Sequence, residues 1–265
     1  MAAVEVRHYD TLDGSYDVVW SEENENQFVS CSGDGSIKLW DVAVPGPRPV
    51  MGYVGHTAEV YSVDWNLQGK EHFLSSSWDH SVRLWDPTRE QALTVFGEHE
   101  YCVYEARWSP SLPRMFASCS GDCSVRLWDA SAPRAQTTFR AHEFEVLSCD
   151  WNKYNEHELV TASVDKSLLF WDIRKLDTHV SALHGHRYAV RRVRYSPHSP
   201  HILASASYDM QVIVWDMMHP DEPMRAQLNH HTEFAVGLEW SLFSDLLASC
   251  GWDSKVSLWH QPSHE

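Results

Sequence analysis

Histidine and cysteine are the residues of this sequence whose chemistry first suggests a metal site or a catalytic site. The 265-residue chain contains 17 His and 6 Cys. No C-x-x-C pair is present, and His230 and His231 are adjacent rather than spaced as in H-E-x-x-H. Cys31, Cys119 and Cys250 each lie three residues before an Asp, a position typical of small buried strand residues. The sequence therefore predicts neither a metal site nor a cofactor.

A phosphate-binding loop and an activated serine are not supported either. The segment Ser-Gly-Asp-Gly-Ser at 32–36 lies between two runs typical of strands, whereas a phosphate loop joins a strand to a helix. The nucleophile pattern G-x-S-x-G does not occur in the sequence. We therefore expect a protein that is not an enzyme.

The composition predicts a folded protein of a reducing compartment. Hydrophobic residues make up 43% and charged residues 22%, with 13 Trp, 10 Tyr and 9 Phe to support a packed core. No apolar run approaches the roughly 18 residues that a bilayer-spanning helix needs, and the first residues lack the pattern of a secretory leader. We therefore expect a soluble, intracellular chain with no direct membrane insertion.

A repeat of about 44 residues runs through nearly the whole chain. Each unit has a Trp with an Asp six residues before it. The Trp positions are Trp40, Trp85, Trp128, Trp171, Trp215 and Trp259, and the Asp positions are Asp34, Asp79, Asp122, Asp165, Asp209 and Asp253. Five units have a His upstream, nine residues before an aromatic residue: His56, His99, His142, His186 and His231. Thr11 stands where the first His is expected.

Short apolar runs bounded by Gly, Asp and Asn, such as 60–65, 73–77 and 81–85, predict several strands in each unit. A period near 44 that ends in Trp-Asp resembles the WD-repeat β-propeller family, whose blades are four-stranded antiparallel sheets. The resemblance implies a buried hydrogen-bonded relay of His, strand hydroxyl, Asp and Trp in each blade. The strand hydroxyls would be those of Ser75, Ser118, Thr161 and Ser205. The repeated residues are then structural rather than catalytic.

We therefore expect an all-β WD-repeat β-propeller that occupies residues 1–265 as a single domain, with six repeats visible. Residues 4–9 could supply the outer strand of the last blade and so close the ring. Alternatively, the chain lacks the N-terminal blade of a seven-bladed parent. Family members have one more blade before the region that matches Tyr9, and this sequence starts at that boundary. A truncated chain of this kind is the expectation that we favour.

The net charge of −16 says little about a partner. Eleven of the 37 acidic residues are the repeated Asp of the turns and of the Trp-Asp pairs, and the remaining acids exceed the 21 basic residues by five. A modestly acidic surface disfavours nucleic acid and mildly favours a basic partner, although ordinary solubility explains the same charge.

Residues next to the repeated positions are the candidates for a binding surface. Trp78 and Trp252 are outside the two repeated aromatic registers, and both directly precede a turn Asp, as Tyr208 does. In the propeller family, this position and the third and fifth residues after the repeated His lie on the upper face. The candidate binding residues are Asp13, Tyr16, Asp17, Glu59, Tyr61, Trp78, Tyr104, Glu145, Tyr208, Phe234 and Trp252. Exposed aromatic rings beside acids suit a basic amphipathic helix, unless the rings pack against neighbouring loops.

Several segments also resemble one branch of the family, the receptors for the type 2 peroxisomal targeting signal (peroxin seven). The segments are 55–65, 147–156, 188–197 and 230–234, and they include loop residues that a propeller scaffold does not require. The resemblance implies a receptor that shuttles between cytoplasm and peroxisome matrix. Its partners would be cargo proteins with an N-terminal type 2 signal, such as 3-ketoacyl-CoA thiolase, a co-receptor (the long form of the type 1 signal receptor or an equivalent) and the peroxisomal docking complex.

The signal read by that branch is a helix with an Arg, a His and apolar positions, which agrees with an aromatic and acidic patch. We predict that Glu59 pairs with the basic groups of the signal, supported by Asp13, Asp17 or Glu145. The rings of Tyr61, Trp78 and Trp252 would hold its apolar face or the co-receptor.

Two other functions remain open. The segment 160–174 looks like the box by which some propellers dock on the linker of a cullin-type ubiquitin ligase, with Arg174 as its distinguishing residue. The chain could therefore be a substrate adaptor, or a generic scaffold for the assembly of complexes. A basic signal helix as ligand would favour the receptor, whereas linker binding that depends on Arg174 would favour the adaptor.

Overall fold

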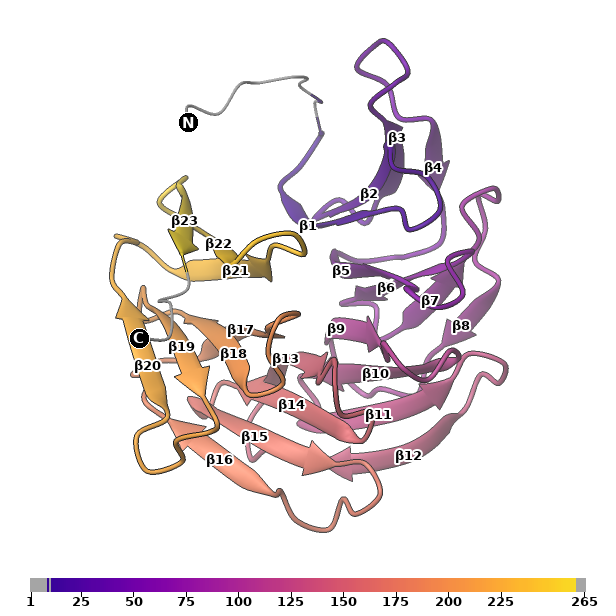
Figure 1. Ribbon diagram of the computed structural model, residues 1–265. Helices are drawn as coiled ribbons and strands as arrows, with labels where there is room; N and C mark the ends of the chain where they lie inside the picture. The colour runs from indigo at the N-terminus through magenta and orange to yellow at the C-terminus, as the bar shows by residue number, and fades with distance from the viewer. Residues whose placement is uncertain (1–8, 10, 261–265) are drawn as a thin grey trace. The chain divides into compact units, whose positions relative to one another are not determined.

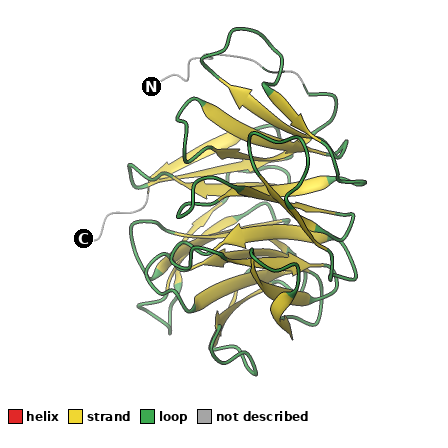
Figure 2. Cartoon of the chain, turned by 90° about the vertical axis from the view of Figure 1, so that its right-hand side faces the viewer, coloured by secondary structure: helices red, strands yellow, loops and turns green. Residues whose placement is uncertain are grey.

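The computed structural model describes residues 9 and 11–260, and their regular secondary structure is entirely β-strand (Figures 1 and 2). These residues form six antiparallel sheets that follow one another along the sequence. Each sheet corresponds to one of the six repeats. The predicted fold class, an all-β WD-repeat propeller with six blades, is confirmed.

The chain divides into two compact units, and the boundary runs through the third sheet. The first unit runs to Trp108 and adds Leu112–Ser118 and Arg126–Thr137; the second comprises Ser109–Ser111, Cys119–Val125 and the chain from Thr138 onward.

The strands of the first three sheets are β1 (Ser15–Trp20), β2 (Gln27–Ser32), β3 (Ile37–Asp41) and β4 (Met51–Tyr53); β5 (Val60–Trp65), β6 (Phe73–Ser77), β7 (Val82–Trp85) and β8 (Thr94–Phe96); and β9 (Val103–Trp108), β10 (Met115–Ser120), β11 (Ser124–Asp129) and β12 (Ala135–Arg140). Those of the other three are β13 (Val146–Trp151), β14 (Glu158–Ser163), β15 (Ser167–Asp172) and β16 (Ser181–His184); β17 (Val190–Tyr195), β18 (Ile202–Ser207), β19 (Val212–Asp216) and β20 (Met224–Leu228); and β21 (Ala235–Trp240), β22 (Leu246–Gly251) and β23 (Val256–His260).

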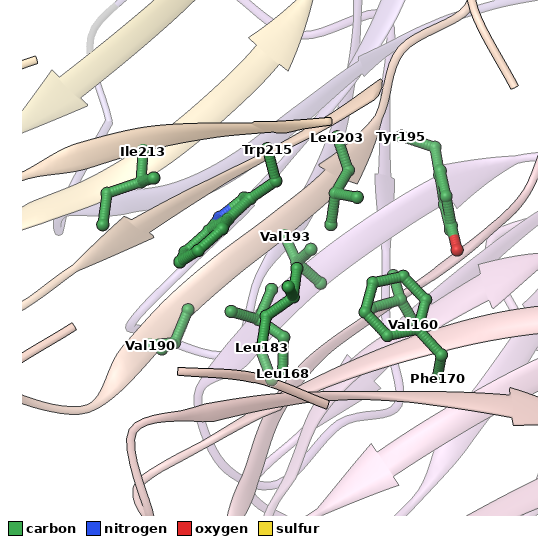
Figure 3. Close-up of a cluster of buried hydrophobic side chains, with 11 residues drawn as sticks. Val160, Leu168, Phe170, Leu183, Val190, Val193, Tyr195, Leu203, Ile213 and Trp215 are labelled. Carbon is green, nitrogen blue, oxygen red and sulfur yellow. The ribbon is translucent and has the colours of Figure 1, made fainter. Parts of the chain in front are cut away.

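Apolar side chains hold neighbouring sheets of one unit together face to face. In the second unit, Val160, Leu168 and Phe170 of the β13–β16 sheet pack against side chains of the β17–β20 sheet, including Val193 and Trp215 (Figure 3). All five are at most 4% exposed. Burial of a whole Val, Leu or Phe side chain contributes about 1.5–3 kcal/mol. A sheet buried on both faces explains why the central strands are almost continuous runs of apolar and small residues.

The predicted closing strand at residues 4–9 lies, apart from Tyr9, outside the described residues. Tyr9 is not in a strand, and its ring packs on Trp40 of the first sheet with 4.8 Å between centroids. Its hydroxyl donates to the carbonyl oxygen of Asp41 at 3.4 Å. The prediction is therefore wrong for Tyr9, because its ring packs on Trp40 instead, and it stays a prediction for the other residues.

A hydrogen-bonded relay of Trp, strand hydroxyl and His lies inside each of the last five blades, and the second blade also shows the predicted bond from His to Asp. The indole Nε1–H of Trp85 donates to the hydroxyl of Ser75 at 2.8 Å, and His56 Nε2 lies 2.6 Å from the same hydroxyl. His56 Nδ1 lies 2.7 Å from Asp79 Oδ2. A carboxylate can only accept, so Nδ1 carries the proton and Nε2 accepts from Ser75. All donors therefore point in one direction along the relay.

The other blades repeat this geometry. The Trp-to-hydroxyl distance is 2.8–3.0 Å at the other five sites, and the hydroxyls belong to Ser30, Ser118, Thr161, Ser205 and Ser249. The His-to-hydroxyl distance is 2.7–2.9 Å at His99, His142, His186 and His231. The predicted set Ser75, Ser118, Thr161 and Ser205 is confirmed, and Ser30 and Ser249 extend it. The repeated polar residues are thus used within the sheets.

Burial and hydrogen bonding oppose each other at the Asp of the relay. Burial acts to raise the pKa of Asp79, but hydrogen bonds from His56, Ser81 and Thr57 outweigh it and hold the pKa well below its ordinary value. At Asp165, burial is likewise outweighed, chiefly by His142 and Ser167, which lowers the pKa to about 2. Burial lowers the pKa of His56, although its bond to Asp79 acts the other way. The second relay therefore holds a neutral His beside an ionised Asp.

Two variants of Thr161 separate the hydroxyl of the relay from its methyl group. Thr161→Val keeps the volume but leaves Trp171 Nε1–H and His142 Nε2 without their buried partner, and we expect it to lower the free energy of unfolding by about 1–3 kcal/mol. Thr161→Ser keeps the hydroxyl, as the other five blades do, and we expect a smaller loss. Urea unfolding measures both, and equal losses would contradict a role for the hydroxyl.

The depressed pKa of Asp165 predicts a loss of stability in acid. Between the ordinary Asp value of 3.8 and the folded value of about 2, the unfolded chain binds more protons than the folded chain. Stability is therefore full above about pH 4 and falls as the pH drops toward 2. We expect Asp165→Asn to flatten this dependence by up to about one proton, measured by urea unfolding across the range. The exposed Asp177, in the loop between β15 and β16, provides the control; an equal effect of Asp177→Asn would overturn the assignment.

Candidate functional site

The turn between the second and third strands of each sheet carries the repeated Asp, and we call the surface around it the turn face. One backbone hydrogen bond arranges two variable side chains there. Trp78 N–H donates to the carbonyl of Glu59 at 3.0 Å, and Tyr208 N–H donates to that of Ala189 at 3.1 Å. Trp252 and Phe234 are joined in the same way at 3.0 Å. The residue before the turn Asp therefore lies beside the third residue after the repeated His.

A β-bulge at the start of the first strand exposes a third variable side chain on this face. The pairing of β1 with β2 skips a residue between Ser15 and Asp17, and that of β5 with β6 skips one between Val60 and Ser62. The residues passed over are Tyr16 and Tyr61. A bulged residue is released from the strict alternation of a strand, which re-aims its side chain. These are the fifth positions that the sequence predicted to be on a binding face.

Four predicted residues of the first unit form one continuous group, which we call the first aromatic cluster: Tyr16, Tyr61, Trp78 and Tyr104. The ring of Tyr61 stacks on Tyr16 with 4.6 Å between centroids and on Trp78 with 5.4 Å. Tyr104 meets Tyr61 edge-on at 5.6 Å. Stacking leaves Tyr61, Trp78 and Tyr104 partly buried, while Tyr16 stays 44% exposed. The rings pack against each other and present a joint apolar surface.

Two acidic residues adjoin this cluster. The backbone carbonyl of Glu59 is bonded to Trp78, and among the described residues, 9 and 11–260, its side chain forms no hydrogen bond or ion pair. Asp13 is exposed and accepts from the N–H of Gly14 at 2.7 Å. A Cβ at Gly33 would come within 3.0 Å of Asp13 Oδ2 and 3.2 Å of the Tyr16 ring, so the absence of a side chain there lets both approach. Glu59 and Asp13 thus add negative charge to the first aromatic cluster.

Asp17, also predicted as a binding residue, is turned toward the neighbouring sheet. Its Oδ2 accepts from Val63 N–H on β5 at 3.3 Å. Ser62 accepts in the same way from Ala106 N–H at 3.3 Å, and Ser148 from Val193 N–H at 3.1 Å. All three residues directly follow the bulged residue of their first strand. Asp17 therefore acts as a brace between sheets, and the bulge register is the signal that could have identified it.

Three predicted residues of the second unit form the second aromatic cluster: Tyr208, Phe234 and Trp252. The ring of Phe234 lies 5.0 Å from Tyr208 and 5.1 Å from Trp252, centroid to centroid. Trp252 is 66% exposed, and the other two are partly buried. Glu145 lies on the turn face of the β13–β16 sheet, where its carbonyl accepts from Val164 N–H at 3.1 Å. The predicted residues of the second unit therefore include one aromatic group and one separate acid.

Sequence reasoning missed an apolar pocket of about 580 Å³ on the turn face of the second unit. Its lining residues are Val164, Lys166, Tyr188, Ala189, Tyr208, Met210 and Phe234. Only Tyr208 and Phe234 were among the predicted residues. Tyr188 is the second residue after its repeated His, and Met210 directly follows its turn Asp. Neither register was included in the prediction.

The described residues contain no group of three or more His, Cys, Asp or Glu side chains arranged to hold a metal ion. Nor do they include a helix long and apolar enough to cross a membrane.

The brace assigned to Asp17 predicts a stability effect without a binding effect. We expect Asp17→Ala to lower the free energy of unfolding by about 0.5–1.5 kcal/mol, because Val63 N–H loses its acceptor. Asp17→Ser should retain most of the stability, since Ser62 and Ser148 form the same bond elsewhere. Urea unfolding tests both variants, and a larger loss for Ser than for Ala would refute the brace.

Comparison with known proteins gives two results. The family described as WD domain, G-beta repeat matches residues 8–41, 47–86, 90–129, 134–172, 177–216 and 223–260. Proteins named peroxisomal targeting signal 2 receptor match a short segment: that of Dictyostelium discoideum is 58% identical over 55 residues, and that of Mus musculus is 56% identical over 57 residues. Peroxisome biogenesis protein 7 of Arabidopsis thaliana is 47% identical over 55 residues.

The two results differ in extent. The segments shared with these three relatives cover 20–21% of this chain and 17% of each relative. The predicted resemblance to type 2 signal receptors is confirmed within that segment. The six repeat matches together extend over most of the sequence. Each contains the first three strands of one sheet, and the last five also contain the fourth strand of the preceding sheet. The chain therefore belongs to the WD-repeat family, described as WD domain, G-beta repeat.

Proposed function

We propose that this chain is a non-catalytic receptor that binds the N-terminal type 2 peroxisomal targeting signal of cargo proteins. The observation that carries the proposal is the first aromatic cluster together with Glu59. The backbone of Glu59 is bonded to Trp78, and its carboxylate has no hydrogen-bond partner among the described residues. The names of the relatives that share a fifth of the chain support the same function.

The cluster matches the chemistry of a basic amphipathic helix. Stacked rings give a broad apolar surface at a small cost in side-chain entropy, because Tyr and Trp have few rotatable bonds. Carboxylates at the rim favour basic side chains and disfavour acidic ones. A helix that lays its apolar positions on Tyr61 and Trp78 would bring an Arg or His toward Glu59, with Asp13 in support. Asp17 is engaged by β5 and is no longer part of the proposed contact.

The remaining parts of the proposal concern the transport cycle. The cargo would include proteins such as 3-ketoacyl-CoA thiolase, and a co-receptor would close over the bound signal. The receptor would then reach the peroxisomal docking complex and shuttle between cytoplasm and peroxisome matrix. Trp252 would contact the signal or the co-receptor. Each of these steps is a proposal that rests on the similarity to the named receptors.

The ligase-adaptor alternative depends on Arg174. Its guanidinium donates from Nε and Nη2 to the two carboxylate oxygens of Asp172, at 2.9 and 2.6 Å. An adaptor would have to release this bidentate pair or use other donors of the guanidinium. The receptor therefore remains the better supported function.

Charge reversal at Glu59 tests the proposal. We expect Glu59→Lys to weaken binding of a fluorescent type 2 signal peptide by about 1–3 kcal/mol, which is roughly 5- to 150-fold, because repulsion replaces an ion pair. Fluorescence anisotropy measures the affinity, with and without the co-receptor. Glu71→Lys is the matched control, because Glu71 is exposed in the loop between β5 and β6, at the opposite end of these strands.

A peptide with Ala in place of its Arg completes a double-mutant cycle. If Glu59 contacts that Arg, the two substitutions are not additive, and the Glu59 effect shrinks with the altered peptide. Equal losses for Glu59→Lys and Glu71→Lys would instead reveal a general charge effect and remove Glu59 from the site. Absence of binding by a folded wild-type chain with the co-receptor would overturn the receptor function.

A further inference from the structure

The apolar pocket of the second unit has a composition unlike that of the first aromatic cluster. Of its seven described lining residues, Lys166 alone is charged, and six are apolar or aromatic. Tyr188 is 62% exposed and Met210 is 38% exposed. Large apolar side chains that gather around an exposed hollow are typical of a protein-interaction site.

The hollow exists because small residues stand where the second sheet has large ones. In the second sheet, Trp78 and Glu59 occupy the two positions joined by the backbone hydrogen bond on the turn face. The corresponding pairs here are Val164 with Glu145, and Tyr208 with Ala189. Val164 and Ala189 thus leave room, while Tyr208 and its ring partner Phe234, 5.0 Å away, form one wall.

Met210 forms another wall of the pocket, and its backbone has a left-handed conformation that is unfavourable for residues with a side chain. Its φ is +69°, in the left-handed region, and Gly35 occupies the same turn position in the first sheet with a φ of +80°. A residue with a side chain costs about 1 kcal/mol or more there compared with glycine. Because glycine satisfies this turn, the turn itself does not require a thioether side chain. A flexible, polarizable Met at a pocket rim is well suited to adapt to a partner.

The charge at the rim defines the kind of partner. The two turn carboxylates next to the pocket are held inside their sheets, Asp165 by His142 at 2.7 Å and Asp209 by His186 at 3.0 Å. The Lys166 ammonium belongs to the pocket lining itself and is exposed. Glu145 is partly buried on the neighbouring strand end. A carboxylate on the partner would complement Lys166, whereas a second basic group would be repelled.

We propose that this pocket is a docking site for an acidic amphipathic segment of a protein partner. The segment inserts a bulky apolar side chain between Tyr208, Met210 and Tyr188 and places a carboxylate against Lys166. The site is opposite in sign to the first aromatic cluster, so the two surfaces take different ligands. The inference is independent of the signal proposed for that cluster, because it depends only on the pocket.

A model peptide tests the proposal with the full chain. The probe is a fluorescent helical peptide of about 14 residues with Leu at the i, i+3, i+4 and i+7 positions and Glu at the others; its counterpart has Lys in place of Glu. We expect saturable binding of the Glu peptide and a preference over the Lys peptide. Met210→Gly should weaken binding by about tenfold, and this variant is expected to fold because glycine suits the turn. Lys166→Glu should reverse the preference between the peptides.

The control variant is Glu71→Lys, at an exposed position in the loop between β5 and β6, which we expect to leave the affinity for the Glu peptide unchanged. The proposal is overturned if the wild type does not bind the Glu peptide, if Met210→Gly binds it as tightly as the wild type, or if Glu71→Lys weakens binding as much as Met210→Gly does.

Discussion

One hydroxyl group per blade, shared between a Trp and a His, is the constraint on which the rest of the structure depends. Two buried nitrogens, Trp85 Nε1 and His56 Nε2, meet at the hydroxyl of Ser75, and neither has water to replace it. His56 in turn donates from Nδ1 to Asp79, whose carboxylate also accepts from the backbone N–H groups of Thr57 and Ser81. The relay thereby ties the Trp strand to the turn and to the loop before the first strand.

Because the relay fixes the turn relative to the loop before the first strand, it determines where variable side chains lie on the turn face. Because the turn and the preceding loop are locked together, the residue before the turn Asp lies next to the third residue after the His. The scaffold has no chemical requirement for either side chain, since the bond between them uses only backbone atoms. The same pair of positions can therefore hold Trp78 with Glu59 in one sheet and Tyr208 with Ala189 in another. Ligand specificity is then a matter of which side chains the identical frames present.

The period of the sequence was sufficient to predict the sheets and the relay, because both depend on spacings within one unit of about 44 residues. The grouping of Tyr16, Tyr61, Trp78 and Tyr104 was also predictable, since all occupy registers next to repeated residues. The function of Asp17 was not, because the repeat aligns it with Ser62 and Ser148 but does not show that this position accepts a hydrogen bond from the neighbouring sheet. The apolar pocket was missed for another reason. It arises from the small side chains of Val164 and Ala189, and small residues in a sequence do not by themselves indicate a pocket.

The sign of the charge that a surface recognises follows from the partners of its carboxylates and not from the net charge of the chain. Asp79 and Asp165 contribute to the value of −16, yet both are ionised within a relay and hydrogen-bonded there. Glu59 differs, because its backbone is bonded to Trp78 of the first aromatic cluster and its carboxylate has no such bond among the described residues. At the apolar pocket Asp165 and Asp209 are bonded to His142 and His186, and Lys166 is a lining residue. An acidic chain can therefore present one surface that selects a basic helix and another that selects an acidic one, because local pairing acts at shorter range than the screened net charge.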